Sequence, residues 1–167
     1  MEHSSPASTT LRLDDKLLVD TVTTNLMGPI RMSSSLIEHL KRRDDAVIAY
    51  TSPILGFVPL VFTAVYSATK AALHSYVLSQ RFVLKGTSVR VLEMEPPWVR
   101  TDLMNSREAE QAMPLDQFIA ETMTVFATDA EEILMDSARP FRANVGPREH
   151  AFVDEFNARM LAVTQNS

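Results

Sequence analysis

The 167-residue sequence contains no cysteine and only four glycines, no two of which are close together. The absence of cysteine excludes a disulfide framework, a thiolate nucleophile and a cysteine-ligated metal. The four histidines, His3, His39, His74 and His150, lie far apart without the spacing of metal ligands, so the sequence predicts no metal site. The scattered glycines form no glycine-rich turn whose backbone N–H groups could cradle a phosphate.

Positive charge and long apolar segments are scarce as well. Sixteen lysines and arginines stand against 21 aspartates and glutamates, a net charge of -5, whereas a nucleic-acid-binding face needs concentrated basic residues. The one basic cluster, residues 41–43, fits a helix C-terminus, where cations are favoured. No apolar run approaches the roughly 18 residues of a membrane span, and residues 1–10 resemble no signal peptide. We therefore expect a cytoplasmic protein that binds neither nucleic acid nor membranes.

The composition is that of a globular protein, with 46% hydrophobic and 22% charged residues. The chain length fits one domain of roughly 100–200 residues. Residues 1–12 are rich in serine and threonine and predict a flexible N-terminus, and residues 13–167 predict a single α/β domain.

Apolar spacing predicts that helices and strands alternate along the chain, as in a parallel α/β fold. Residues 46–51 and 88–94 have the apolar, β-branched pattern of buried parallel strands. Helices are expected over residues 14–40, 63–85 and 115–126, where apolar residues recur at steps of three and four.

Several residues predict where helices end, begin or bend. Gly86 fits a left-handed cap after the second helix, an Asp129-x-x-Glu132 capping box predicts another helix start, and Pro147 predicts the start of the last helix. Gly28–Pro29 interrupts the first helix. Because Pro29 has no N–H, the helix should bend there and leave the carbonyl of Asn25 free.

Tyr66 and Lys70 are four residues apart in the second helix, so they share one of its faces. A phenol, with a pKa of about 10, is a poor acid–base group at neutral pH. A nearby ammonium favours the phenolate and brings that pKa closer to the useful range. The alternative is that the two residues are ordinary side chains of an amphipathic helix, because this spacing also occurs by chance.

The neighbouring segments favour the functional interpretation. Ser52 ends a predicted strand, Asn25 precedes it on the bent helix, and "VRVLEMEPPWVRTDL" reads as a strand followed by a proline turn. From about residue 17 to 103, and more loosely to the C-terminus, the chain resembles the short-chain dehydrogenase/reductase family. Asn25, Ser52, Tyr66 and Lys70 match the order of its catalytic tetrad. "YSATKAALHSY", with "FVPL" before it, is most similar to the subgroup of D-alanine-transfer-like oxidoreductases.

The resemblance implies a role for each of these residues in converting a small-molecule carbonyl or alcohol substrate. Tyr66 would exchange a proton with the substrate oxygen, and Lys70 would lower the pKa of Tyr66 and hold the nicotinamide ribose. Ser52 would bind the substrate oxygen, and the Asn25 carbonyl would hold a water of the proton relay.

The resemblance also implies the fold and the cofactor. The expected fold is the C-terminal half of a doubly wound, Rossmann-type parallel sheet, helix-rich with few strands. The cofactor would be NAD or NADP, contacted by Tyr66 and Lys70 and by the proline turn, through Pro96, the backbone of Val99 and the hydroxyl of Thr101.

Two features depart from the family pattern. Ser52 lies one residue farther from Tyr66 than usual, and alignment from Gly56 instead puts Pro53, which has no hydroxyl, at the catalytic serine position; counting from Asn25 restores Ser52. The family's N-terminal half, with its glycine-rich turn, has no counterpart in the chain. We therefore expect weak or absent binding of NAD(P)(H) by the chain alone.

Three functions remain open at this point. The first is an oxidoreductase whose dinucleotide half is truncated or supplied elsewhere, and the second is a non-redox remnant that associates. The third is a hydrolase, because Ser67-x-x-Lys70 matches the nucleophile motif of β-lactamases, although the accompanying Ser-Asp-Asn and Lys-Thr-Gly motifs are absent.

The same features predict a homodimer or larger homo-oligomer. With only two predicted strands, the sheet would be marginal and would expose an unpaired edge. In the resembled family, the helices that carry Asn25 and Tyr66 pack against their copies across a two-fold axis. The apolar residues expected at this interface are Leu36, Ile37, Leu40, Leu73, Val77 and Phe82.

Overall fold

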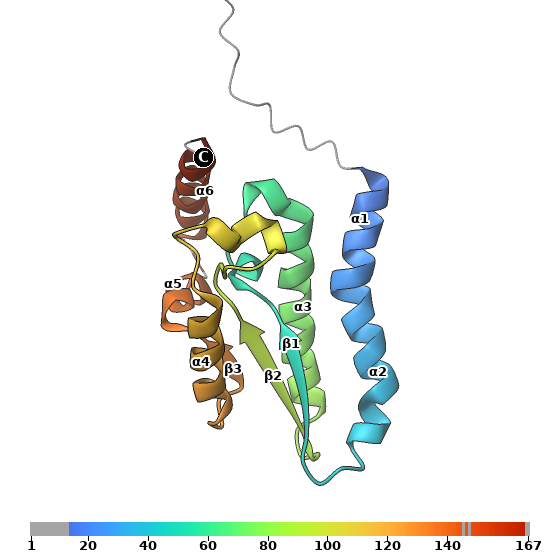
Figure 1. Cartoon of the computed structure of the whole chain (residues 1–167). Coiled ribbons are helices and arrows are strands. Elements are labelled where there is room, and N and C mark those ends of the chain that lie inside the picture. The colour runs from blue at the N-terminus through green and yellow to red at the C-terminus, as the bar shows by residue number, and fades with distance from the viewer. Residues whose placement is uncertain (1–13, 145, 147, 166–167) are drawn as a thin grey trace, which may run out of the picture.

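A three-stranded parallel sheet forms the centre of the molecule (Figure 1). The computed structural model describes residues 14–144, 146 and 148–165. The strands are β1 (Ala46–Thr51), β2 (Val89–Glu95) and β3 (Glu132–Leu134), in the order β1-β2-β3. The expected α/β fold is therefore confirmed, as are the two predicted strands, the second of which lies one residue later than expected.

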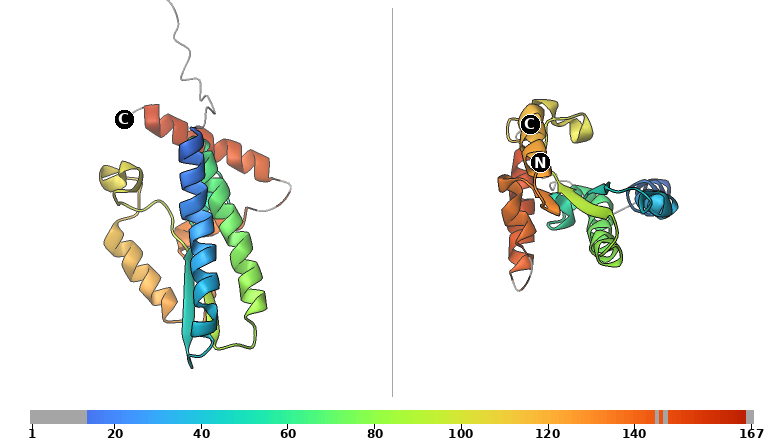
Figure 2. Two further views of the ribbon diagram at one scale, coloured as in Figure 1. Left: turned by 90° about the vertical axis from the view of Figure 1, so that its right-hand side faces the viewer. Right: turned by 90° about the horizontal axis from the view of Figure 1, so that it is seen from below.

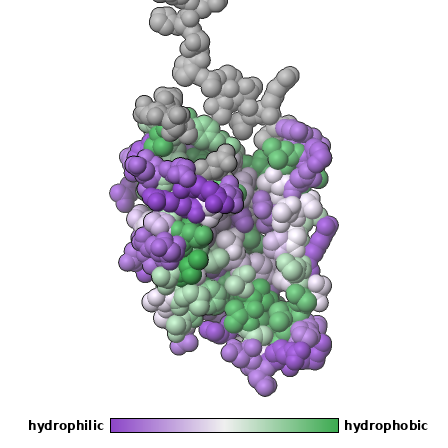
Figure 3. Space-filling view, in the orientation of Figure 1, coloured by the Kyte–Doolittle hydropathy of each residue, from purple (hydrophilic) through white to green (hydrophobic). Residues whose placement is uncertain are grey.

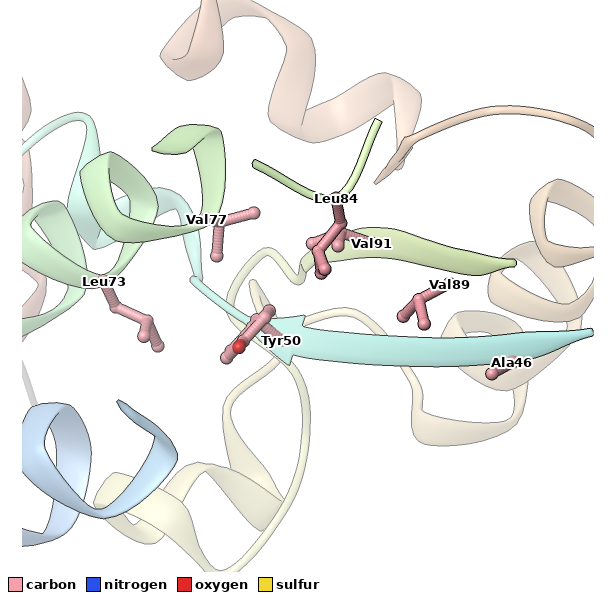
Figure 4. Close-up of a cluster of buried hydrophobic side chains, with 7 residues drawn as sticks. All are labelled: Ala46, Tyr50, Leu73, Val77, Leu84, Val89 and Val91. Carbon is pink, nitrogen blue, oxygen red and sulfur yellow. The ribbon is translucent and has the colours of Figure 1, made fainter. Parts of the chain in front are cut away.

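Helices cover both faces of the sheet, as a doubly wound fold requires (Figures 1 and 2). Successive residues of a strand point to opposite faces. Val91 of β2 packs with Leu73 and Val77 of α3 (Ala64–Val83) in the cluster drawn in Figure 4. Leu92 packs instead with Ile133 and with the apolar side of α4 (Leu115–Phe126).

This packing corrects part of the predicted interface between copies. Leu73 and Val77 are 2% and 0% exposed and belong to the core, which Ile37 and Leu40 also contact. These residues face the sheet, because a long helix that covers a sheet must turn its most continuous apolar stripe inward. Phe82, like Leu36, remains exposed and available to a partner.

The first helix is interrupted earlier than expected. It comprises α1 (Asp15–Val22), a π-helical segment at Thr23–Met27 and α2 (Gly28–Leu40). The Gly28 N–H donates to the Thr23 carbonyl, five residues back. Pro29 therefore falls in the first turn of α2, directly after the π segment. The irregularity that a proline would cause is absorbed by the π segment, in which Asn25 lies.

The capping-box prediction at Asp129-x-x-Glu132 is wrong. Glu132 begins β3, which pairs in parallel with β2, Glu93 lying opposite Glu132. The Glu132 carboxylate accepts two hydrogen bonds from Arg142, at 3.1 and 2.9 Å. In a capping box it would instead accept from the backbone N–H of the residue that caps the helix. Burial of Ile133, which is 0% exposed, fixes the strand.

The C-terminal part folds back over the loop that follows β1. After α5 (Arg139–Arg142), α6 (Glu149–Gln165) buries Phe156 against Val58 and Leu60. Asn157 stabilises this contact with two hydrogen bonds. Its Oδ1 accepts from the Val61 N–H at 2.6 Å, and its Nδ2 donates to the Pro59 carbonyl at 2.9 Å.

Two sequence predictions fall outside the described residues, namely the flexible residues 1–12 and Pro147 as the start of the last helix. The left-handed cap at Gly86 is confirmed, with a φ of 78°. Within the described part of the chain, no helix combines the length and apolarity needed to cross a membrane.

Candidate active site

Tyr66 and Lys70 lie on one face of α3, as their spacing predicts. The Lys70 ammonium lies 5.5 Å from the centroid of the Tyr66 ring. It donates a hydrogen bond of 3.0 Å to the carbonyl of Thr51, the last residue of β1. The helix and the strand end are thus joined through the lysine, beside Ser52.

Ser52 continues the β1–β2 ladder by one residue, since its N–H donates to the Met94 carbonyl at 2.9 Å. The residue is 0% exposed, and its Oγ has no hydrogen-bond partner among the described residues. Leaving a buried hydroxyl unpaired costs about 1–3 kcal/mol. Pro53, the alternative occupant of the serine position, serves as the cap of a 3₁₀ turn at Ile54–Gly56.

The loop that carries Ser52 is held tightly against α3. A side-chain Cβ at Gly56 would lie only 3.2 Å from the carbonyl carbon of Lys70, closer than ordinary contact allows. Glycine at this position therefore lets the loop cross directly over the turn of α3 that carries the lysine. The π segment containing Asn25 also packs against α3, with Asn25 half-buried.

Burial controls the ionisation of the pair. It raises the pKa of the Tyr66 phenol and lowers the pKa of the Lys70 ammonium. The direction for Tyr66 is opposite to the one that phenolate formation needs, because Lys70 is directed at the Thr51 carbonyl and contacts only the ring face. Tyr66 in this chain is accordingly a neutral phenol that can donate a proton.

The proline turn after β2 adjoins the same loop. The Pro96 carbonyl accepts a hydrogen bond of 3.2 Å from the Ile54 N–H. Arg100 fixes the rest of the turn, because its guanidinium donates to the carbonyls of Ala109 and Ala112, both at 3.0 Å.

Ser106 organises the turn at Val99 and Thr101, a role that the sequence did not predict. Its Oγ lies 2.7 Å from the Val99 carbonyl and accepts from the Thr101 N–H at 3.1 Å. The Thr101 hydroxyl accepts from the Leu103 N–H at 3.2 Å and keeps its own hydrogen for donation. A single serine in a short 3₁₀ segment, here Leu103–Glu108, carries no sequence pattern that would reveal this role.

Ser67, the nucleophile of the hydrolase alternative, is 2% exposed. Its hydroxyl accepts a hydrogen bond of 3.2 Å from the Leu60 N–H. A buried hydroxyl engaged with the backbone is poorly placed to attack a substrate, so the geometry favours a structural role for Ser67.

A second polar group lies farther along α3 and β2. His74, Glu93 and Glu95 offer ligand atoms within 4.8 Å of one another. Histidine spacing alone predicted no metal site. The sequence carries no signal for this group, because its three residues come together only when α3 packs on β2.

Comparison with known sequences gives partial matches. A profile of the family described as short chain dehydrogenase matches residues 4–112. The uncharacterized oxidoreductase DltE of Bacillus subtilis is 39% identical over 94 residues, covering 56% of this chain and 37% of that protein. The NADPH-dependent 1-acyldihydroxyacetone phosphate reductase of Saccharomyces cerevisiae is 32% identical over 83 residues, covering 50% and 28%. The chain thus spans well under half the length of either relative.

Solved structures share the fold at low sequence identity. A short chain dehydrogenase from Burkholderia cenocepacia in complex with NADP superposes with a TM-score of 0.73 at 21% identity, covering 92% of this chain and 64% of that one. A short-chain dehydrogenase from Sphingobium yanoikuyae in complex with NADPH gives a TM-score of 0.68 at 13% identity, covering 91% and 59%.

Proposed function

Because this chain belongs to the short-chain dehydrogenase family, we propose that it carries the Asn-Ser-Tyr-Lys part of an NAD(P)-dependent site that interconverts a small carbonyl compound and its alcohol. The observation that carries the proposal is the hydrogen bond of Lys70 to the Thr51 carbonyl, which joins the helix face of Tyr66 and Lys70 to the end of β1. Ser52 follows Thr51 directly, and its hydroxyl has no partner among the described residues. Within the family, we propose kinship with the DltE-like oxidoreductases, on the motif around Tyr66 and the 39% identity.

The proposed reduction assigns two donors to the substrate oxygen. Ser52 is buried with a free O–H, which would orient and polarise the carbonyl. Tyr66, held neutral by the raised pKa of its phenol, would give its proton to the same oxygen as negative charge develops there. The Lys70 ammonium would stabilise the tyrosinate left behind. The Asn25 carbonyl would hold the water that returns a proton.

The donor set fits the nicotinamide end of the cofactor. NAD(P)H, when bound, supplies the hydride that a carbonyl carbon must receive. Lys70 and Tyr66 would hold its ribose, and the Pro96 turn its carboxamide, through the Val99 backbone and the Thr101 hydroxyl that still has a hydrogen to donate. The scattered glycines offer no cradle for the pyrophosphate.

The proposal is tested with a tyrosine pair on one helix. Oxidation of NADPH or NADH is followed with small aldehydes and ketones for the wild-type chain, Tyr66→Phe and Tyr76→Phe. Tyr76, whose hydroxyl accepts from Gln80 at 2.5 Å, is the control for loss of a hydroxyl from α3. Any activity should vanish in Tyr66→Phe and persist in Tyr76→Phe. Activity that survives in Tyr66→Phe would refute the assigned role.

We also propose that the chain forms a homodimer or larger homo-oligomer. Among the described strands β1 pairs only with β2, which leaves its other edge open. Figure 3 shows hydrophobic side chains gathered in the region of β1 and α2, and Val47 of β1 is 39% exposed. Phe82 and Val83, near the end of α3, are 71% and 73% exposed.

A further inference from the structure

Two carboxylates are buried at the end of β2, on the face that contacts α3. Val89 and Val91 contribute this face of the strand to the apolar core. Glu93 and Glu95 continue the same alternation and are both 0% exposed. Glutamate is almost never fully buried unless it is paired, so these two side chains need partners.

Glu93 has a partner on α3. The Nδ1 atom of His74 lies 2.9 Å from each oxygen of the Glu93 carboxylate. The imidazole is held in place by Phe57, whose ring meets it edge to face with centroids 4.9 Å apart. The His74 side chain keeps 16% exposure, which makes it the one member of the group that solvent can reach.

Glu95 has no such partner. Neither of its carboxylate oxygens makes a hydrogen bond to any residue that the structure describes. The Arg142 Nε atom is 3.7 Å from it, beyond hydrogen-bond distance, because that guanidinium donates to Glu132 at 3.1 and 2.9 Å. Glu95 is thus a buried carboxyl that points toward other ligand atoms and receives no hydrogen bond. Such a carboxyl is a candidate ligand for a cation.

We propose that His74, Glu93 and Glu95 bind a first-row divalent metal ion, for which Zn²⁺ is the best fit. One imidazole nitrogen and two carboxylate oxygens are zinc ligands at about 2.0–2.2 Å, and tetrahedral zinc accepts a water as its fourth ligand. The three ligand atoms already lie within 4.8 Å of one another, so small rotations of the two glutamates would bring them to a common ion. The water position would lie on the side of His74, the partly exposed ligand.

Local charge supports a cation at this position. Arg142 donates its hydrogen bonds to Glu132 and lies 3.7 Å from Glu95, and Arg81 forms an ion pair with Glu131 at 3.3 Å, so these two guanidiniums compensate the two buried carboxylates only in part. A divalent ion would neutralise both of them. The cost of burying two acids side by side would then be offset by metal binding.

Metal binding should depend on pH. An imidazole nitrogen and a carboxylate oxygen ligate a metal only when they carry no proton, so protons compete with the metal for His74, Glu93 and Glu95. The affinity for metal should therefore rise with pH.

The test is calorimetric titration of the chelator-treated full chain with ZnCl₂ at pH 6.5, 7.2 and 8.0, with parallel CoCl₂ spectra. We expect one equivalent of Zn²⁺, tighter binding at the higher pH, and the visible absorption of four-coordinate Co²⁺. Glu95→Gln and His74→Gln should each weaken Zn²⁺ binding at least about 10-fold. Glu95→Gln keeps the shape and neutrality of the protonated acid, so its circular dichroism should match that of the wild type.

Two controls separate this site from surface binding. His39→Gln removes an exposed histidine of α2, and Glu131→Gln removes a carboxylate whose side chain is 65% exposed. Both should bind Zn²⁺ as the wild type does. The proposal is overturned if no saturable binding occurs, or if Glu95→Gln and His74→Gln bind Zn²⁺ as tightly as the two controls.

Discussion

Burial affects the ionisable residues around α3 in a common direction, toward their neutral forms. It raises the pKa of Tyr66 and of Glu95 and lowers that of Lys70. Each shift arises because a low-dielectric surrounding disfavours the charged form. For Tyr66 burial alone sets the direction of the pKa shift, so the spacing to Lys70 was a poor guide to its sign.

The raised pKa of Glu95 makes stability depend on pH. The folded state holds the proton to about pH 8, whereas the unfolded carboxyl has the ordinary value of 4.5. The contribution is therefore complete below the unfolded value and is lost as pH rises through this window. In the presence of a chelator, urea unfolding should show the wild type losing stability between these values, and Glu95→Gln should lose markedly less. Parallel profiles for the two proteins would contradict the assignment.

At the scale of the elements, local patterns predicted most of the framework. The run Ala46–Thr51 was recovered without a shift because it is apolar on both faces. The helix expected over residues 63–85 was found at Ala64–Val83, because its apolar spacing is long and Gly86, with a φ of 78°, follows its end. The three-residue β3 was missed, because a strand this short carries no period of its own and forms only by pairing with β2.

The candidate site was predictable to a different extent. Spacing was enough to put Tyr66 and Lys70 on one face, since both belong to one helix. The contact of Lys70 with the Thr51 carbonyl, the role of Ser106 and the grouping of His74 with Glu93 join segments that are distant in sequence. Such contacts follow from packing, for which a single sequence contains no local signal.

The crossing of the loop over α3 gives a test at this scale. Gly56→Ala would push a methyl group to 3.2 Å from the Lys70 carbonyl carbon, which is backbone and cannot turn aside. We expect it to lower the free energy of unfolding by about 1–3 kcal/mol, as overpacking does. Urea titration measures this effect. Gly86→Ala, strained by its φ of 78° but with open space around it, should cost about 1 kcal/mol and leave the site undisturbed.

For the whole molecule, the exposed apolar surface predicts association. Leu36 and Phe82, which lie on different helices, are 45% and 71% exposed. Sedimentation at micromolar concentration should give a species larger than the 18.7 kDa chain, and its melting temperature should rise with protein concentration. Phe82→Ser should shift the distribution toward the monomer, whereas Leu73→Ala, a core change, should lower stability at every concentration. A compact 18.7 kDa monomer would contradict the proposal.

Cofactor affinity is also a property of the whole chain. The proposed contacts reach only the nicotinamide end, and the four glycines form no phosphate-binding turn. We therefore expect calorimetry to find that the isolated chain binds NAD(P)(H) much more weakly than a micromolar Kd, which corresponds to about -8 kcal/mol. Micromolar binding would show that other residues hold the adenosine and pyrophosphate.

The strand order has a consequence for how the chain acquires its structure during synthesis. β2 lies between two parallel neighbours, with Ala46 paired to Val89 and Glu93 paired to Glu132. Neither pairing is local, so loop closure must precede every sheet hydrogen bond. On the ribosome, β1 and the segment of Ser52 must wait for β2 to emerge, while α3 can form as soon as it is made. The nascent chain would therefore expose β1 to other chains for the time needed to translate the residues from Thr51 to Val89.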